Sequence, residues 1–251
     1  MIVFVTGATS GFGAAIVRRF IGEGHRVIAL GRREDRLDAL RAEFPAASLH
    51  TVVLDVRDNA AVEQAVANLP QEFADIDVLV NNAGLALGLE PAQRAELDDW
   101  ERMVDTNIKG LMYVTRAVLP GMVARKRGHV VNIGSVAGSY PYPGGNVYGA
   151  SKAFVRQFSL NLRADLVNNF VRVTDIAPGL SSGTEFSSVR FHGDDQKAAQ
   201  VYANTQSLSA DDIAESVYWV TTLPAHVNVN VLELMPVTQA PGPLVISRQA
   251  Q

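Results

Sequence analysis

Cysteine is absent from this 251-residue sequence. Its absence excludes disulfides, cysteine-ligated zinc, iron–sulfur clusters and a thiol nucleophile, and it fits the reducing cytoplasm in which we expect the protein. Long apolar runs are also lacking, since none approaches the roughly 18 residues that span a bilayer. The apolar start at residues 1–5 has neither a basic flank nor a cleavage site, so we predict a strand there and no signal peptide.

The sequence also lacks an excess of positive charge. Its formal net charge is −4, and residues 125–127 form its one basic tract. A surface that binds nucleic acid is therefore not expected, and neither is contact with a membrane. The five histidines are scattered without the spacing of metal ligands, so we predict no metal site.

Short apolar runs alternate regularly with longer segments of helical period. This pattern predicts strands at residues 2–5, 26–30, 49–54, 78–80, 129–133, 171–176 and 229–234, and helices at 12–22, 33–43, 58–68, 97–125, 149–168 and 209–222. The strands show little polar alternation, which is typical of a sheet covered on both faces. We therefore predict an α/β protein with a doubly wound, seven-stranded parallel sheet and helices on both faces.

Two segments depart from this alternation. Residues 178–208 show no regular period, and a long irregular segment in a compact domain is usually a lid or a binding loop, so we expect a substrate loop there. Residues 235–251 contain three prolines and are expected to form an extended tail, packed on a neighbouring subunit. No linker divides the chain, so residues 1–251 are expected to form a single domain.

The first predicted strand leads into a glycine-rich turn that is followed by a helix. Glycines permit a sharp turn and a close approach to a pyrophosphate, and the helix N-terminus adds free N–H groups and partial positive charge. A turn without a ligand is the alternative, but the position between strand and helix favours nucleotide binding. The candidate residues are Gly7, Thr9, Ser10, Gly11, Phe12 and Gly13.

Several motifs, in chain order, resemble those of the short-chain dehydrogenase/reductase family. They are Thr6–Gly13, Asn81-Asn82-Ala83-Gly84, Asn107, Ser135, Tyr148-Gly-Ala-Ser-Lys152 and Pro178-Gly179. The resemblance covers essentially the whole chain. It implies a Rossmann fold and a homotetramer with helices 97–125 and 149–168 at an interface. It also implies cofactor contacts at Asp55, Val56, Asn82, Ala83, Gly84, Pro178, Gly179, Leu180 and Thr184, although Asp55 could instead cap a helix.

The residues after the second strand indicate which dinucleotide is bound. An NAD site usually has an acidic residue roughly 20 positions after the glycine-rich turn, whereas this chain has Arg32 and Arg33. Guanidinium groups suit a 2′-phosphate, and cations at a helix N-terminus otherwise oppose the helix dipole. A solvated arginine pair is the alternative, but we expect NADP.

Tyr148 and Lys152 are four residues apart and therefore share a helix face. This spacing is common on ordinary helices, but here it accompanies a dinucleotide motif. An ammonium beside Tyr148 is expected to lower the pKa of the phenol from about 10, which makes Tyr148 the general base in alcohol oxidation and the general acid in reduction. Ser135 is expected to hydrogen-bond the substrate oxygen. The resemblance further implies that Lys152 holds the nicotinamide ribose and that Asn107 anchors a water in a proton relay.

Residues 82–88, 142–148 and 178–191 resemble the NADP-dependent 3-hydroxy acid dehydrogenases of this family. That resemblance implies oxidation of small hydroxy acids such as L-serine, L-allo-threonine and 3-hydroxypropionate, and the reverse reduction of 3-oxo acids or semialdehydes. Asn146 and Arg190 are further candidate substrate residues, because Arg190 can bind a carboxylate bidentately, with His192 as a weaker alternative. Ala177, Ser181 and Ser182 depart from the family pattern beside the pocket, which bears on substrate preference.

Three other functions are compatible with part of the sequence. A broad carbonyl or 3-oxoacyl-thioester reductase shares all the motifs, and substrate competition separates it from the first reading. A protein that senses NADP without catalysis would not need the intact Ser135, Tyr148 and Lys152. A nucleotide-sugar epimerase needs a larger C-terminal domain than the roughly 75 residues after the sixth strand provide.

Overall fold

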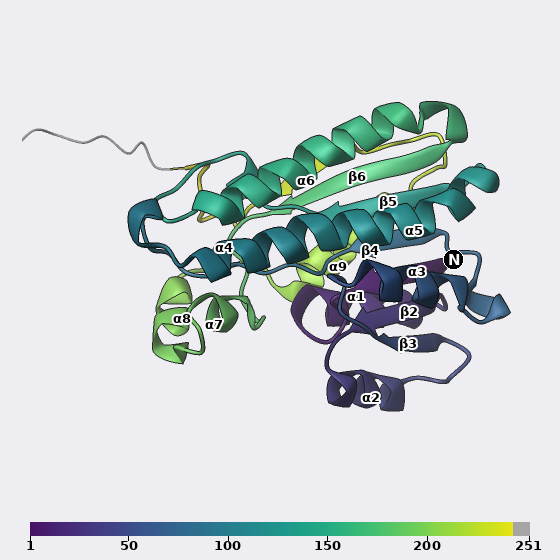
Figure 1. Cartoon of the computed structure of the whole chain (residues 1–251), viewed down its shortest axis with the longest axis horizontal. Helices are drawn as coiled ribbons and strands as arrows, with labels where there is room; N and C mark the ends of the chain where they lie inside the picture. The colour runs from purple at the N-terminus through teal and green to yellow at the C-terminus, as the bar shows by residue number, and fades with distance from the viewer. Residues whose placement is uncertain (243–251) are drawn as a thin grey trace, which may run out of the picture.

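The structure, a computed structural model, describes residues 1–242 and places their strands in one seven-stranded sheet (Figure 1). The strands are parallel in the order β3-β2-β1-β4-β5-β6-β7. Their bounds are β1 Ile2–Thr6, β2 Arg26–Gly31, β3 Leu49–Val53, β4 Val78–Asn81, β5 Gly128–Ile133, β6 Val171–Pro178 and β7 Val231–Leu234. The strand order reverses between β1 and β4, which is where ligands bind in such sheets.

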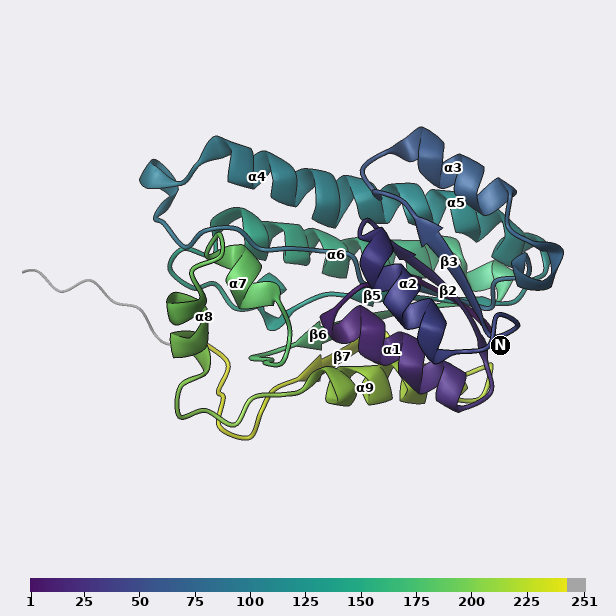
Figure 2. The same ribbon diagram turned by 90° about the horizontal axis from the view of Figure 1, so that it is seen from below.

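Helices cover both faces of the sheet, as Figure 2 shows from a second direction. On one face lie α1 (Gly11–Gly22), α2 (Glu34–Glu43) and α9 (Ala210–Thr222). On the other lie α3 (Asn59–Ala67), α4 (Leu97–Val104), α5 (Leu111–Ala124) and α6 (Asn146–Asp165). Two short helices, α7 (Phe186–Arg190) and α8 (Asp195–Tyr202), lie at one end of the molecule. The predicted fold class is confirmed.

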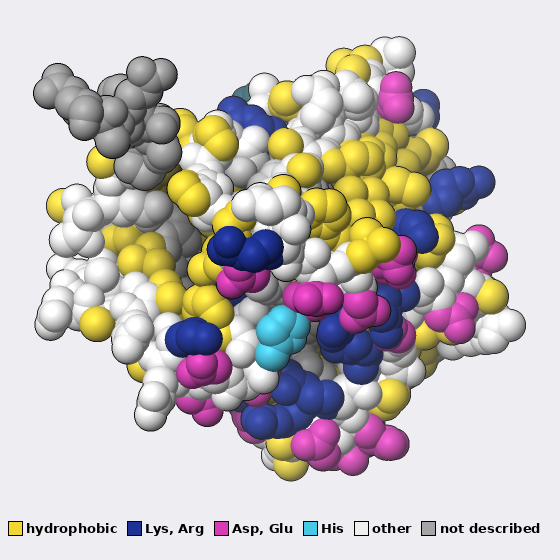
Figure 3. All heavy atoms as spheres, turned by 60° about the vertical axis from the view of Figure 1, so that its left-hand side comes forward, with side chains coloured by type: hydrophobic (Ala, Val, Ile, Leu, Met, Phe, Trp, Pro, Cys, Tyr) yellow, Lys and Arg dark blue, Asp and Glu magenta, His cyan; other side chains and the backbone are white. Residues whose placement is uncertain are grey.

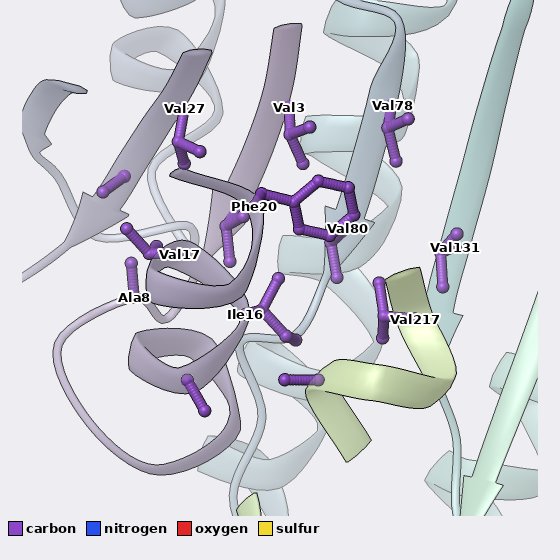
Figure 4. Packing of buried hydrophobic residues seen from close by; sticks show 14 of the residues in the cluster. Val3, Ala8, Ile16, Val17, Phe20, Val27, Val78, Val80, Val131 and Val217 are labelled. Carbon is purple, nitrogen blue, oxygen red and sulfur yellow. The ribbon is translucent and has the colours of Figure 1, made fainter. Parts of the chain in front are cut away.

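Strand β1, which neighbours the central strand β4, is buried on both faces of the sheet. Val3 and Val5 of β1 belong to the core beneath α1 and α9, whereas Ile2 and Phe4 belong to the core beneath α5 and α6. This is the alternation of side chains along a strand. Figure 4 shows Ile16, Val17 and Phe20 of α1 packed against valines of four strands. The buried strand therefore fixes the start of the glycine-rich turn that follows it.

The predicted helix 97–125 is interrupted by a π-helical turn at Asp105–Gly110, between α4 and α5. Such turns carry an extra residue and are frequent at functional sites. Gly110 permits close packing there, since a Cβ at this position would lie 2.6 Å from Cγ2 of Val56. Asn107 lies within the turn and is buried.

The expectation of an irregular segment at residues 178–208 is partly wrong, because α7 and α8 lie within it. The Asp194 carboxylate accepts a hydrogen bond from the Lys197 backbone N–H at 3.1 Å and so caps α8. Helix α7 has five residues, too few to show a helical period.

The described part of the tail packs on its own chain. The Gln239 side-chain oxygen accepts a hydrogen bond from the Leu180 backbone N–H at 2.7 Å. Residues 243–251 of the predicted tail lie outside the described residues. No helix within residues 1–242 is long and apolar enough to cross a membrane.

Candidate active site

A cavity of about 650 Å³ lies at the carboxyl ends of the central strands. It brings together motifs that are far apart in the sequence. The predicted cofactor residues that line it are Gly7, Thr9, Ser10, Gly11, Phe12, Arg32, Arg33, Asp55, Val56, Asn82, Ala83, Gly84, Pro178, Gly179, Leu180 and Thr184. Of the predicted catalytic and substrate residues, Ser135, Tyr148, Lys152 and Arg190 line it as well.

The glycine-rich turn has the geometry of an anion cradle. Gly7 has a φ of +65°, and a Cβ there would lie 2.9 Å from the Cα of Ala83. Gly13 does not line the cavity, but a Cβ on it would lie 2.2 Å from the Gly7 carbonyl oxygen, so it allows α1 to pack directly behind the turn. Ser10 makes no side-chain cap to α1, which leaves the first helical N–H groups for a phosphate. These residues fit a dinucleotide.

The motif after β4 holds this turn in place. The Asn82 side-chain amide donates to the carbonyl oxygens of Thr6 and Gly7 at 2.9 and 3.2 Å. In return, the Thr6 hydroxyl oxygen accepts from the backbone N–H groups of Asn82 and Ala83 at 3.0 and 2.9 Å. The two motifs are therefore a single structural unit across the switch point of the sheet.

The two arginines after β2 face acidic partners. Nη1 of Arg32 lies 3.6 Å from Oδ2 of Asp55, and Nη1 of Arg33 lies 2.8 Å from Oε2 of Glu185. Burial acts to raise the pKa of Asp55, but hydrogen bonds from Arg57 outweigh it and keep that pKa below its usual value. Asp55 does not cap α3, because that position belongs to Asp58. Both Arg32 and Arg33 remain partly exposed and so can reach a 2′-phosphate.

Tyr148 and Lys152 stand one turn apart on α6, and both are buried. Nζ of Lys152 donates to the Ile133 carbonyl oxygen at 2.8 Å and lies 5.9 Å from the centre of the Tyr148 ring. Ser135 follows β5, where its hydroxyl accepts from the Ala137 backbone N–H at 3.1 Å. The predicted Ser–Tyr–Lys group is therefore assembled in one place.

Burial raises the pKa of Tyr148 to about 12, and a hydrogen bond with Ser135 and the positive charge of Arg190 offset this only in part. The expectation that Lys152 lowers this pKa is therefore wrong in this structure. Its ammonium group is directed to the Ile133 carbonyl oxygen, and burial of the phenol dominates. Tyr148 consequently carries its proton at neutral pH.

The sequence interpretation missed Asp175, a buried carboxylate in β6. Its Oδ1 has no hydrogen-bond partner among the described residues. Burial raises its pKa to about 6, against the positive charges of Lys152 and Arg156. Burial also lowers the pKa of Lys152 to about 8, and the charge of Asp175 opposes that shift. The sequence did carry a signal for this residue, because Asp175 is an acidic residue within an apolar strand. A buried charge needs a partner, so such a residue could have been predicted to face a cation.

Asn107 supports the wall of the cavity from behind and does not line it. Its side-chain oxygen accepts from the Leu85 backbone N–H at 2.9 Å, and its amide donates to the Leu85 carbonyl and to the Ser151 hydroxyl at 2.8 and 3.0 Å. These bonds tie the loop after β4 to α6. The water-anchoring role of Asn107 stays a prediction.

Arg190, at the end of α7, lies among three aromatic rings. Its Cζ is 5.2, 5.5 and 5.7 Å from the ring centres of Tyr148, Phe186 and Tyr142. It donates to the Tyr142 hydroxyl, whereas its buried Nε has no partner in the described part of the chain. No carboxylate of residues 1–242 lies within ion-pair distance of Arg190, so the cavity contains a cation that can accept an anionic ligand.

Two candidate substrate residues are not brought into the cavity. The Asn146 amide donates to the Glu90 carbonyl oxygen at 3.1 Å, and His192 pairs with Asp99 at 3.1 Å. Neither lines the cavity. In contrast, Tyr142, Glu185 and Phe186 do line it, although the sequence interpretation did not single them out.

The fold and the site together define a class of protein. The sheet has a dinucleotide cradle at its switch point, and a buried tyrosine, serine and lysine stand beside it with an arginine facing the tyrosine. Within residues 1–242, no three His, Asp or Glu side chains form a group that could hold a metal ion. Such a site is typical of a nucleotide-dependent oxidoreductase.

Comparisons with known proteins identify the family. The family model for short chain dehydrogenases matches residues 1–194, and the chain belongs to this family. An NADP-dependent 3-hydroxy acid dehydrogenase of Salmonella typhi is 65% identical over 248 residues, which cover 99% of this chain and 100% of that protein. Sulfoacetaldehyde reductase 2 of Chromohalobacter salexigens is 53% identical over 98% of both chains. The closed form of a serine dehydrogenase complexed with NADP+ superposes with a TM-score of 0.98 at 63% identity, covering 99% of this chain and 100% of that one.

Proposed function

We propose that the protein is an NADP-dependent dehydrogenase of small 3-hydroxy acids such as L-serine, L-allo-threonine and 3-hydroxypropionate, and that it also reduces the corresponding 3-oxo acids or semialdehydes. The relatives support this proposal. Two of them are a 3-hydroxy acid dehydrogenase and a serine dehydrogenase. The third is named for sulfoacetaldehyde, a carbonyl compound that likewise carries an anionic group close to the reacting carbon.

The position of Arg190 is the observation that supports an acidic substrate. A small hydroxy acid offers little apolar surface, so its charge must supply most of the recognition. Arg190 offers a planar, bidentate donor at 5.2 Å from the ring centre of Tyr148. A carboxylate held by Arg190 brings the hydroxyl group, a few bonds away, to the side of the cavity that holds Tyr148 and Ser135.

The proton chemistry follows from the environment of Tyr148. The bound cofactor would supply the hydride chemistry, with NADP+ as the acceptor in oxidation and NADPH as the donor in reduction. In reduction, Tyr148 donates its proton to the substrate oxygen, and its raised pKa of about 12 keeps that proton available. Ser135 hydrogen-bonds the same oxygen as charge develops on it. In oxidation Tyr148 takes the proton back, and the positive charge of Arg190 opposes the rise in the pKa of the phenol and so favours the phenolate.

The cofactor contacts are part of the proposal. Arg32 and Arg33 bind the 2′-phosphate, the glycine-rich turn binds the pyrophosphate, and Lys152 holds the nicotinamide ribose. Asp55 and Val56 lie against the adenine. The remaining contacts come from the loops after β4 and β6, at Asn82, Ala83, Gly84, Pro178, Gly179, Leu180 and Thr184. Asn107 completes the catalytic group through a bound water.

We also propose a cytoplasmic homotetramer with α4–α5 and α6 in an interface. Phe154 and Phe158 on α6 stack at 5.6 Å and are only half-buried, and such apolar surface favours association. The absence of cysteine supports a reducing compartment. Light scattering of the purified protein measures the assembly, and a monomeric mass would contradict it.

An initial-rate panel with NADP and with NAD tests the function. We expect the fastest turnover with NADP and small 3-hydroxy acids, and slow turnover with the matching uncharged alcohols. The Tyr148→Phe protein is the blank for contaminating activity. A preference for uncharged carbonyl compounds or 3-oxoacyl thioesters would instead establish the broad reductase.

A further inference from the structure

Glu185 lies where the cofactor side and the substrate side of the cavity meet. It is the residue before α7, and its Oε2 lies 2.8 Å from Nη1 of Arg33. Its other carboxylate oxygen lies 3.6 Å from Nη2 of Arg36. The neighbouring Thr184 rests on the glycine-rich turn, since a Cβ on Gly11 would be 3.0 Å from its side chain. The start of α7 is therefore docked on the cofactor cradle.

The ion pair is formed at neutral pH. Burial acts to raise the pKa of Glu185, but hydrogen bonds from Arg33 and Ser10, and the charges of Arg33 and Arg36, outweigh it and lower that pKa. Arg33 also donates to the Thr9 hydroxyl at 3.1 Å, so one guanidinium joins the end of β2, the glycine-rich turn and α7. Figure 3 views this end of the molecule, where basic side chains stand next to acidic ones.

The other end of α7 reaches the substrate side. The helix contains five residues, so Glu185 and Arg190 bracket it. Arg190 is held there by its bond to the Tyr142 hydroxyl, and its backbone carbonyl accepts from the Gly88 N–H at 2.9 Å. A helix this short is held by its tertiary contacts rather than by its own helical stability. Besides the contacts at its two ends, the buried Ser187 hydroxyl hydrogen-bonds the Tyr202 hydroxyl at 2.6 Å. Glu185 thus holds one end of the helix that carries Arg190 at its other end.

We propose that Glu185 is a positioning residue which, through its ion pair with Arg33, holds α7 over the cavity and couples the 2′-phosphate site to Arg190. The inference rests on the proposed function for the identity of the two anions. Arg33 has five N–H donors and can bind a phosphate and the Glu185 carboxylate together. A 2′-phosphate that fixes Arg33 lowers the entropic cost of the pair, and this coupling is reciprocal.

Amide hydrogen exchange tests the coupling without reference to activity. We expect NADP to slow exchange of residues 184–192 at least threefold more than NAD does, each at saturation. Glu185→Gln should abolish the difference. Glu43→Gln is the matched control, because Glu43 forms a similarly exposed ion pair with Arg18 at 2.7 Å that does not involve α7. The control variant should keep the difference in protection between NADP and NAD. Equal protection by both cofactors in the wild-type protein would overturn the proposal.

Cofactor binding and kinetics show whether Glu185 supports the binding of the 2′-phosphate to Arg33 or competes with it. If Glu185 helps the phosphate, Glu185→Gln raises the Kd for NADP at least threefold and leaves the Kd for NAD unchanged. If Glu185 only competes with the phosphate, NADP binds more tightly to the variant, which overturns the proposal. The KM for a 3-hydroxy acid should rise at least threefold with kcat within twofold of wild type, and an unchanged KM would also overturn it. A wild-type protein inactive on hydroxy acids refutes the proposed substrate, whereas the exchange and binding results still decide the link between Glu185 and the phosphate.

Discussion

Replacing Arg190 with methionine removes one guanidinium and keeps a side chain that fills part of its space. In the structure, that group has a single hydrogen bond, to Tyr142, and a buried Nε without a partner among the described residues. Hydrogen bonds to charged groups contribute about 1.5–3 kcal/mol. At about 1.36 kcal/mol for each factor of ten, loss of the substrate contact should lower kcat/KM for a 3-hydroxy acid roughly 10- to 150-fold.

The assay follows NADPH formation from 3-hydroxypropionate and from its uncharged amide. The Arg190→Met protein should lose activity on the acid and change less than threefold on the amide. Arg190→Lys keeps the charge without the planar fork and should fall between the two. Equal losses on acid and amide, in a variant with an unchanged Tm, would refute the carboxylate contact and assign Arg190 to the folding of α7.

Three further predictions concern the cofactor, the pH profile and a buried acid. Replacing both Arg32 and Arg33 with alanine should raise the KM for NADP roughly 10- to 100-fold, because charge-assisted bonds are lost from a partly exposed site, and equal losses with NAD would contradict this. The kcat/KM for carbonyl reduction should fall as the pH rises through about 8, because Lys152 then loses its charge and holds the nicotinamide ribose only through a weaker, uncharged hydrogen bond; a flat profile to pH 10 would contradict this. The pKa of Asp175 is raised to about 6 in the folded protein. Between about pH 4 and 6 the folded state therefore binds more protons than the unfolded state, so the free energy of unfolding falls as the pH rises through that window. Relative to wild type, Asp175→Asn should therefore gain stability between pH 4.5 and 7.5, by at most roughly 3 kcal/mol, and a gain independent of pH in thermal melts would count against this.

The fold was predictable because its signals are local. Strands such as Ile2–Thr6 are buried on both faces and so read as continuous apolar runs, and Asp58 marks the start of α3 as its N-cap. The π-helical turn at Asp105–Gly110 was not predictable, since one extra residue leaves the apolar pattern of a long helix almost unchanged. Helix α7 was missed because a single turn shows no period.

The residues of the site were predictable only where they belong to a sequence motif. The motif residues Ser135, Tyr148 and Lys152 meet as expected, but the contacts of Glu185 with Arg33 and of Arg190 with Tyr142 join distant segments, and long-range contacts leave no local pattern. The raised pKa of Tyr148 was missed for a related reason. The spacing of two residues on a helix shows that they are neighbours, but it does not show how deeply they are buried.

The most direct test of the account compares wild-type protein and Tyr148→Phe in the oxidation of 3-hydroxypropionate by NADP, with NADPH binding measured in parallel by fluorescence. The substitution keeps the ring and removes the transferable proton. The account predicts turnover by the wild type, a loss of roughly 10²–10⁴ in kcat for the variant, and NADPH affinities within threefold of each other. A variant that keeps a tenth of the wild-type kcat, or a wild type that oxidises no 3-hydroxy acid with NADP, would contradict it.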